Sequence, residues 1–301
     1  MKKTVRLLSI MAVIVAGCTA CGQNVTKNTA NDSGKVKVMT SFYTMYDFAQ
    51  KIGGEKVEIT NMVPSGTEPH DWEPSAIDIR NMEDADVFIY NGAGMEHWAE
   101  DILKSLDNSE LITVEASEGV ELIREGKEND PHVWLDPENA KIEMEHIKDA
   151  FIEADKDNAE YYNKNYETYS RQLDGLNQEF EETLSQVTNK DIIVAHKAFG
   201  YLCKAYGLNQ IAIEGLMPDS EPDPARMEEI IQLAKKKEIN TIFFEELVSP
   251  KVANTIAKEI GAKTEVLNPL EGLSEEQMDA GEDYFSVMRT NLKQIKKALE
   301  N

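Results

Sequence analysis

The sequence is poor in cysteine, in histidine and in positive charge. It has only 3 cysteines among 301 residues, which excludes a disulfide framework and a cysteine-rich zinc domain. Its 31 Lys and Arg residues are outnumbered by 55 Asp and Glu residues, giving a net charge of −24. Nucleic-acid binding needs clustered cations that displace the counterions of phosphates, so this charge balance excludes it. The negative field of the chain would instead attract a cation.

Long hydrophobic runs are also missing, apart from one short run near the N-terminus. Three cations within the first six residues precede the apolar run 7–16, which is too short to span a bilayer and is typical of a secretory signal. The run leads into Val-Ala-Gly followed by Cys18, and small residues before a cysteine resemble the bacterial lipobox. We therefore predict a signal peptide over residues 1–17, cleavage before Cys18 and a lipid on its sulfur. The alternatives are an ordinary signal peptide with an incidental cysteine, and lipidation at Cys21, which is weaker because Cys18 stands where an aliphatic residue is expected.

The next segment, residues 18–34, is polar and nearly devoid of aliphatic side chains. Such a segment cannot bury enough apolar area to offset its chain entropy, so we predict a flexible tether between the membrane and the folded part. No other stretch approaches the ~18 apolar residues of a transmembrane helix. We expect a protein anchored to the cell membrane by its lipid, facing the extracellular or periplasmic side.

Eight short runs rich in β-branched residues are separated by stretches of helical length. Strands that alternate with helices in this way predict parallel sheets built from βαβ units. Four runs lie in each half, which predicts an α/β fold of two similar lobes, each a parallel sheet of about four strands with flanking helices. The predicted strands are 36–40, 57–63, 86–90 and 111–114 in the first half, and 191–195, 210–213, 241–245 and 264–267 in the second.

One long helix is predicted between the two halves. Over residues 161–187 the apolar side chains recur at intervals of three or four, with no proline and only one glycine. At ~1.5 Å per residue this helix would be about 40 Å long. A peripheral amphipathic helix would show the same pattern, but the position at the junction favours a rigid connector. The predicted domains are an N-terminal lobe over 35–155, a connecting backbone helix over 156–188 and a C-terminal lobe over 189–301.

Three of the five histidines lie at strand ends or in loops stiffened by proline. His70, after the strand 57–63, and His132 both belong to Pro-His-x-Trp units. Proline restricts the backbone, which suits a fixed ligand geometry. His196 lies just past the carboxyl end of the strand 191–195, where open α/β sheets bind ligands. Each histidine alone is more typical of a structural or solvated residue, whereas the three together predict a metal site.

Three imidazoles need a fourth donor to close a tetrahedral metal site, or a water molecule if the site is catalytic. The acidic candidates near strand ends are Glu245, Glu246 and Glu271. Glu271 lies on the loop after the last predicted strand. Spacing alone does not choose between these three acids.

The chain resembles the metal-binding lipoproteins of ABC importers for zinc and manganese, the group called cluster A-I or TroA-like. The resemblance covers Val36 to Leu299 and the lipobox. Its motifs, specific when taken together, are PHDWEPS from Pro69, DPHVWLDP from Asp130, AHKAFGY from Ala195, GLMPDSEPDP from Gly215 and the segment 267–273.

This resemblance implies a binding protein that is not an enzyme, with a metal in the cleft held by two ligands from each lobe. By position, the ligands are His70 and His132 from the first lobe and His196 and Glu271 from the second, so the resemblance selects Glu271 among the acids. It also implies delivery of the metal to an ABC permease and its ATPase. We expect the binding protein to be a monomer.

The residue at position 196 decides the metal that we expect. Manganese members of this family generally carry an acid at the position of His196, whereas three imidazoles and one carboxylate suit Zn²⁺. We therefore expect Zn²⁺ as the transported ligand, with Mn²⁺ as the alternative. Many zinc members also carry a His-rich loop in the first lobe, but the matching residues 115–130 contain no histidine. A solvated loop is expected there.

Acids that accept the remaining N–H of each metal-bound imidazole should orient the ligands, and the candidates are Glu73, Asp136 and Glu245.

Two other functions are weighed against transport. In a zinc hydrolase Glu271 would act as general base, but the sequence has no His-Glu-x-x-His helix. In a surface adhesin the metal would be only structural, and the apoprotein would then be largely unfolded.

Overall fold

The computed structural model of the protein describes residues 34–218 and 222–300. The predicted signal peptide, Cys18 and all of the predicted tether except Gly34 lie outside these residues, as does the middle of the motif 215–224. The described residues all belong to one compact unit. Within the described ranges, no helix is both long and apolar enough to cross a membrane.

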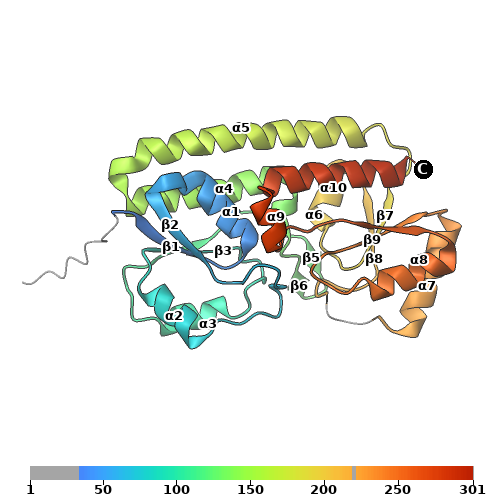
Figure 1. The fold of residues 1–301 in the computed structure, drawn as a ribbon, viewed down its shortest axis with the longest axis horizontal. Helices are drawn as coiled ribbons and strands as arrows, with labels where there is room; N and C mark the ends of the chain where they lie inside the picture. The colour runs from blue at the N-terminus through green and yellow to red at the C-terminus, as the bar shows by residue number, and fades with distance from the viewer. Residues whose placement is uncertain (1–33, 219–221, 301) are drawn as a thin grey trace, which may run out of the picture. The chain divides into compact units, whose positions relative to one another are not determined.

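The N-terminal lobe is built on a parallel sheet with the strand order β2–β1–β3–β4 (Figure 1). Its strands are β1 (Val36–Thr40), β2 (Val57–Asn61), β3 (Val87–Tyr90) and β4 (Ile112–Glu115), and its first helices are α1 (Tyr43–Gly53), α2 (Ala76–Glu83) and α3 (Ala99–Ser105). Side chains alternate across a strand. Val87 and Ile89 accordingly join the large core that includes α1, whereas Phe88 packs in a smaller cluster with α2 and α3 residues. The sheet is therefore covered on both faces, as a parallel sheet requires.

The C-terminal lobe is built on a second parallel sheet, with the strand order β10–β9–β7–β8. Its strands are β7 (Asp191–Val194), β8 (Asn209–Ala212), β9 (Thr241–Phe244) and β10 (Lys263–Val266), and its helices include α6 (Gly200–Tyr206), α7 (Pro224–Lys236) and α8 (Lys251–Ile260). Numbered within each lobe, both sheets have the order 2–1–3–4. The predicted fold class, two similar α/β lobes with four parallel strands each, is confirmed.

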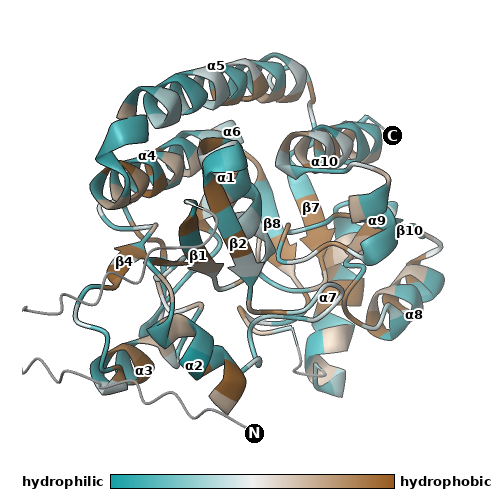
Figure 2. Cartoon of the chain, turned by 60° about the vertical axis from the view of Figure 1, so that its left-hand side comes forward, coloured by the Kyte–Doolittle hydropathy of each residue, from teal (hydrophilic) through white to brown (hydrophobic). Residues whose placement is uncertain are grey.

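A layer of long helices runs along both sheets (Figure 1). It contains α4 (Pro137–Ala154), α5 (Ala159–Leu184) and α10 (Tyr284–Leu299), the last preceded by the short α9 (Glu275–Asp279). The 26 residues of α5 make it about 39 Å long. Its buried side chains follow the predicted stripe: Tyr162, Leu173, Leu176, Phe180 and Leu184. Figure 2 shows the other residues of α5 as mostly hydrophilic, whereas β7 is largely hydrophobic.

The segment predicted as a solvated loop contains the end of β4 and a small antiparallel hairpin. Its strands are β5 (Arg124–Glu125) and β6 (Glu128–Asn129), two residues each, which is too short for a periodic sequence signal. Three single-turn 3₁₀ helices complete the described elements, over Gly54–Lys56, Val133–Leu135 and Lys156–Asn158.

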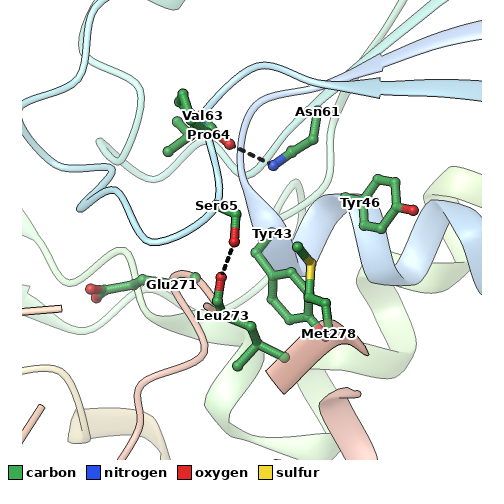
Figure 3. A pocket seen from close by; sticks show the side chains of 10 residues that line it. Tyr43, Tyr46, Asn61, Val63, Pro64, Ser65, Glu271, Leu273 and Met278 are labelled. Atoms are coloured by element: carbon green, nitrogen blue, oxygen red, sulfur yellow. Dashed lines mark hydrogen bonds between the residues drawn. The ribbon is translucent and has the colours of Figure 1, made fainter. Parts of the chain in front are cut away.

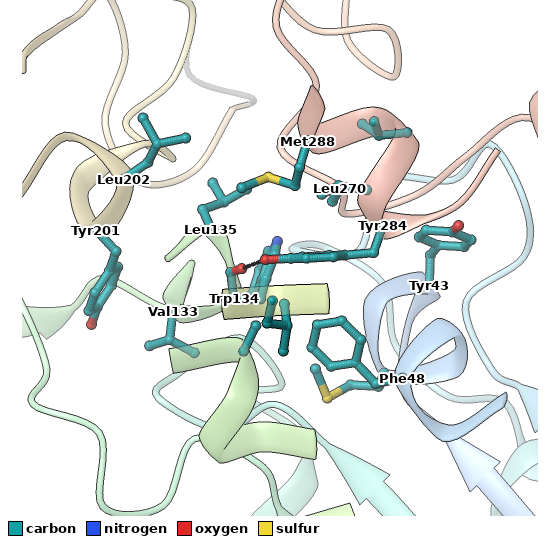
Figure 4. Close-up of a cluster of buried hydrophobic side chains, with 14 of the residues drawn as sticks. Tyr43, Phe48, Val133, Trp134, Leu135, Tyr201, Leu202, Leu270, Tyr284 and Met288 are labelled. Atoms are coloured by element: carbon teal, nitrogen blue, oxygen red, sulfur yellow. Dashed lines mark hydrogen bonds between the residues drawn. The ribbon is translucent and has the colours of Figure 1, made fainter. Parts of the chain in front are cut away.

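The two lobes share one large hydrophobic core (Figure 4). The indole of Trp134 is fully buried in it, 5.1 Å from the ring of Phe42. The ring of Tyr284 at the start of α10 packs edge-on against Phe48 of α1 at 5.0 Å, and its hydroxyl donates to the carbonyl of Trp134. The start of α10 is thereby attached to the N-terminal lobe.

Cys203 is a buried residue of α6. Burial, with a smaller contribution from the charge of Asp130, raises the pKa of its thiol to about 12. A thiol in this state is neither a metal ligand nor a nucleophile at neutral pH.

Glu143 on α4 is a fully buried carboxyl group, and neither of its oxygens has a hydrogen-bond partner in the structure. Burial, and then the charge of Glu96, raise the pKa of Glu143 well above its usual value. After burial, the charge of Glu143 also contributes to the raised pKa values of Tyr201 and Tyr284. An acid whose pKa is raised by folding stabilises the fold only at low pH, and this contribution is lost as the pH rises above the unfolded pKa of about 4.5.

We therefore expect Glu143→Met to raise the free energy of unfolding by about 1–3 kcal/mol at pH 7, because it removes an unsatisfied buried group. The gain should be smaller at pH 4.5, where the carboxyl is protonated in the folded protein and about half protonated in the unfolded chain. Urea unfolding at the two pH values measures this, with Glu153→Met at an exposed position of the same helix as the control. A loss of stability in Glu143→Met, or an equal gain at both pH values, would contradict the assignment.

Candidate metal centre

The structure brings together the four residues that the family resemblance selects. His70 follows β2, His196 follows β7 and Glu271 follows β10. The carboxyl ends of parallel strands lie at one edge of a sheet, so residues that follow them can meet there. His132 immediately precedes the 3₁₀ turn 133–135. One ligand atom from each of the four lies within 4.8 Å of the others, and all four side chains are at most 3% exposed.

The distances between these atoms fit a tetrahedral ion. Nε2 of His132 lies 3.2 Å from Nε2 of His70, 3.2 Å from Nε2 of His196 and 2.9 Å from Oε1 of Glu271. Oε1 of Glu271 lies 3.3 Å from Nε2 of His70 and 3.5 Å from Nε2 of His196. A tetrahedron with Zn–N distances of about 2.0–2.1 Å has edges of about 3.3–3.4 Å. Five of the six donor–donor edges are thus close to those of a tetrahedral Zn²⁺ site.

Two of the imidazoles are oriented by carboxylates. Nδ1 of His132 lies 2.7 Å from Oδ1 of Asp130, and Nδ1 of His196 lies 2.6 Å from Oε1 of Glu245. A carboxylate that accepts from Nδ1–H leaves Nε2 unprotonated and directed at the metal. Glu245 is therefore located where the sequence places an orienting acid.

The other two predicted orienting acids have different contacts. Asp136 accepts from the backbone N–H of Glu138 as the N-cap of α4. Glu73 is an exposed residue whose carboxylate lies 3.6 Å from Nε2 of His97. Asp130, which was not among the predicted acids, orients His132, and its position two residues before the histidine in Asp-Pro-His is the signal that could have identified it. Gly200 makes room for it, because a Cβ at that position would collide with Oδ2 of Asp130.

The charges of the centre favour an anionic Glu271 beside protonated imidazoles when no metal is bound. Burial alone would lower the pKa of His132 and of His196, but their carboxylate neighbours outweigh it and both pKa values are raised. For Glu271 burial would raise the pKa, but the charges of His196 and His70 hold it well below its usual range. A metal ion that binds here must displace protons from the imidazoles.

A cavity adjoins the centre on the side of α1 (Figure 3). Tyr43, Asn61, Ser65 and Met278 are among the residues that line it. The carboxylate of Glu271 points away from Tyr43 and Met278. The cavity therefore lies behind the loop that carries Glu271.

The sequence profile described as the periplasmic zinc-uptake complex component A, ZnuA, matches residues 38–298. The chain belongs to the ZnuA family. The recognition of a zinc-type solute-binding protein from its sequence motifs is confirmed.

This ZnuA-family chain is similar to known proteins along most of its length, as three of them show. The high-affinity zinc uptake system protein ZnuA of Bacillus subtilis is 42% identical over 95% of this chain and 96% of its own length. The zinc-binding lipoprotein AdcA of Streptococcus pneumoniae is 39% identical, and this chain spans 62% of its length. The Zn(II)-bound structure of the ZnuA-like domain of AdcA, 42% identical, has a TM-score of 0.81 and covers 89% of this chain and 100% of that domain.

The laminin-binding protein Lmb of Streptococcus agalactiae, 34% identical with a TM-score of 0.82, covers 88% of this chain and 99% of its own. That protein is described as bifunctional, with adhesin and metal-transporting activity.

Proposed function

We propose that this ZnuA-family protein captures one Zn²⁺ ion with His70, His132, His196 and Glu271 and delivers it to an ABC permease and its ATPase. The observation that carries the proposal is the set of five donor–donor distances between 2.9 and 3.5 Å. Four protein donors fill a tetrahedral shell and leave no position for an activated water molecule. The protein is a binding component, and the hydrolase alternative has no support from its family.

The choice of zinc over manganese rests on the imidazole of His196, since nitrogen donors suit Zn²⁺ and oxygen donors suit Mn²⁺. The soluble form that lacks residues 1–21, stripped of metal, should bind Zn²⁺ much more tightly than Mn²⁺ in a competition titration against a chelator of known affinity. His196→Glu should lose part of this preference. Zinc affinity also exceeds manganese affinity at most sites, so the informative quantity is the change of the ratio between the two proteins. An unchanged ratio in His196→Glu would refute the role of His196 in selectivity.

We further propose that the protein is a monomer, and that a lipid on Cys18 anchors it to the outer face of the cytoplasmic membrane. The small residues before Cys18 and the polar segment after it support the proposal. Membrane association through a lipid requires the acylated sulfur.

In bacteria grown with radiolabelled palmitate, the wild-type protein should carry the label and fractionate with membranes. Cys18→Ala should carry no label, whereas Cys21→Ala should behave like the wild type. Labelling that survives in Cys18→Ala and disappears in Cys21→Ala would move the anchor to Cys21. Adhesion remains the untested alternative that was weighed from the sequence.

A further inference from the structure

The metal centre must open before an ion can enter or leave. Its four side chains are at most 3% exposed, so contacts across the centre have to break. The sequence divides the ligands equally between the lobes. The hydrogen bonds of residues 267–273, the loop that carries Glu271, instead attach Glu271 to the N-terminal lobe.

Hydrogen-bond donors of the N-terminal lobe bind three backbone carbonyl groups of this loop. The indole Nε1–H of Trp134 donates to the carbonyl of Pro269 at 2.7 Å, and the hydroxyl of Thr44 on α1 donates to the carbonyl of Leu270 at 2.5 Å. The hydroxyl of Ser65 donates to the carbonyl of Leu273 at 2.6 Å (Figure 3), and that carbonyl also accepts from the backbone N–H of Gly66 at 3.2 Å. Glu271 is therefore bracketed by contacts to the first lobe.

The loop backbone is strained and buried at the same place. Leu270 has a φ of +64°, which a branched side chain rarely adopts, and it is fully buried. Such a conformation persists only where the surroundings determine it. Releasing the loop from Thr44 and Trp134 would also leave buried carbonyl groups without donors, which is costly.

His196 is attached to the N-terminal lobe more weakly. Its orienting acid, Glu245, belongs to its own lobe and follows β9. The nearby contacts across the lobes use the hydroxyl of Tyr201, which donates to the carbonyl of Asp130 and accepts from the N–H of Ile123.

Two ion pairs with the segment 121–125 add to this contact. They join Lys197 to Glu125 and Lys204 to Glu121, and all four side chains are at least one-third exposed. Exposed ion pairs contribute little to stability. The polar contacts around His196 are thus easier to break than those around Glu271, although Tyr201 and Leu202 of α6 also pack in the shared core.

We propose that Glu271 stays with the N-terminal lobe when the centre opens, and that His196 is the single ligand that withdraws, together with Glu245. This inference rests on the proposed ligand set. Leu267 and Asn268 remain bonded to Phe244 and Glu246 of the second lobe, so the chain flexes after Asn268. An arriving ion first meets three of the four donors, two imidazoles and one carboxylate, and His196 then closes over it.

Hydrogen exchange of single amides in the soluble form without residues 1–21 tests the proposal, since the described fold lies within the unit from Ser33 onward. The N–H of Gly66 reports the loop contact, and the N–H of Ile123 reports the His196 side. Removing zinc should leave Gly66 protected and increase the exchange rate of Ile123 at least ten-fold. Loss of protection at both amides, or at neither, would overturn the proposal.

A pair of matched substitutions gives a second test. Thr44→Val removes the donor to Leu270 and should speed zinc dissociation about ten-fold. Thr40→Val removes an equally buried hydroxyl that is bonded within the first lobe, to Asn61, and should change dissociation little.

Double-mutant cycles separate positioning from general destabilisation. The effect of Thr44→Val should vanish in a Glu271→Ala background and persist in a His196→Ala background. Persistence in both backgrounds would overturn the proposal. Zinc binding unaffected by Glu271→Ala and by His196→Ala would instead refute the ligand set itself, which is a different result.

Discussion

Alanine in place of His132 should lower zinc affinity by more than about 100-fold, because loss of an orienting partner alone costs about 10–100-fold and this change removes a donor. His132 is the most central ligand of the set. Its Nε2 lies within 3.2 Å of atoms from the other three residues. Competition with a chelator of known affinity measures the loss.

The matched control for this experiment is His97→Ala. His97 is about half exposed and contacts only Glu73 among the ion pairs of the described residues. Its removal should leave zinc affinity unchanged. If His132→Ala and His97→Ala bound zinc equally well, the metal would have to lie elsewhere.

Trp134→Ala should lower the free energy of unfolding by about 3–5 kcal/mol, the usual cost of removing a buried tryptophan. It should also weaken zinc binding about ten-fold, because Pro269 loses the donor that holds the Glu271 loop. Chemical unfolding and a zinc titration at a temperature where the variant is folded measure the two effects.

Trp98→Ala is the control that separates the loss of stability in Trp134→Ala from its loss of zinc affinity. Trp98 is 8% exposed and packs in the separate cluster beside α3. Its removal should destabilise the protein without changing its affinity for zinc. Equal zinc affinities of the two folded variants would show that Trp134 supports the fold and not the loop.

The regular elements of this protein are predictable because their physics is local. Strands such as β3 and β7 are runs of β-branched and aromatic residues buried on both faces, which leave a strong pattern in the sequence. The long helix α5 keeps its apolar stripe over seven turns. The β5–β6 hairpin leaves no pattern, because two-residue strands are fixed by their surroundings and not by their own periodicity.

The metal centre shows where sequence reasoning needs three dimensions. Asp130 and Asp136 both precede a proline in one motif, and their sequence settings are nearly alike. An aspartate before Pro-Glu is also a helix N-cap signal, and Asp136 takes that role at α4. Spacing alone does not separate Glu271 from Glu246; the family resemblance selects Glu271, and the structure places it beside the three histidines. No sequence pattern predicts that this loop of the C-terminal lobe is hydrogen-bonded to the N-terminal lobe.

The buried thiol of Cys203 gives the molecule an internal chemical probe. In a form without residues 1–21 it is the only cysteine of the chain. Burial raises the pKa of this thiol far above neutral pH and keeps alkylating reagents away from its sulfur. Labelling then has to wait until α6 exposes the sulfur to water. Because α6 also carries the Tyr201 contact, the labelling rate with and without zinc measures how often this helix separates from the first lobe.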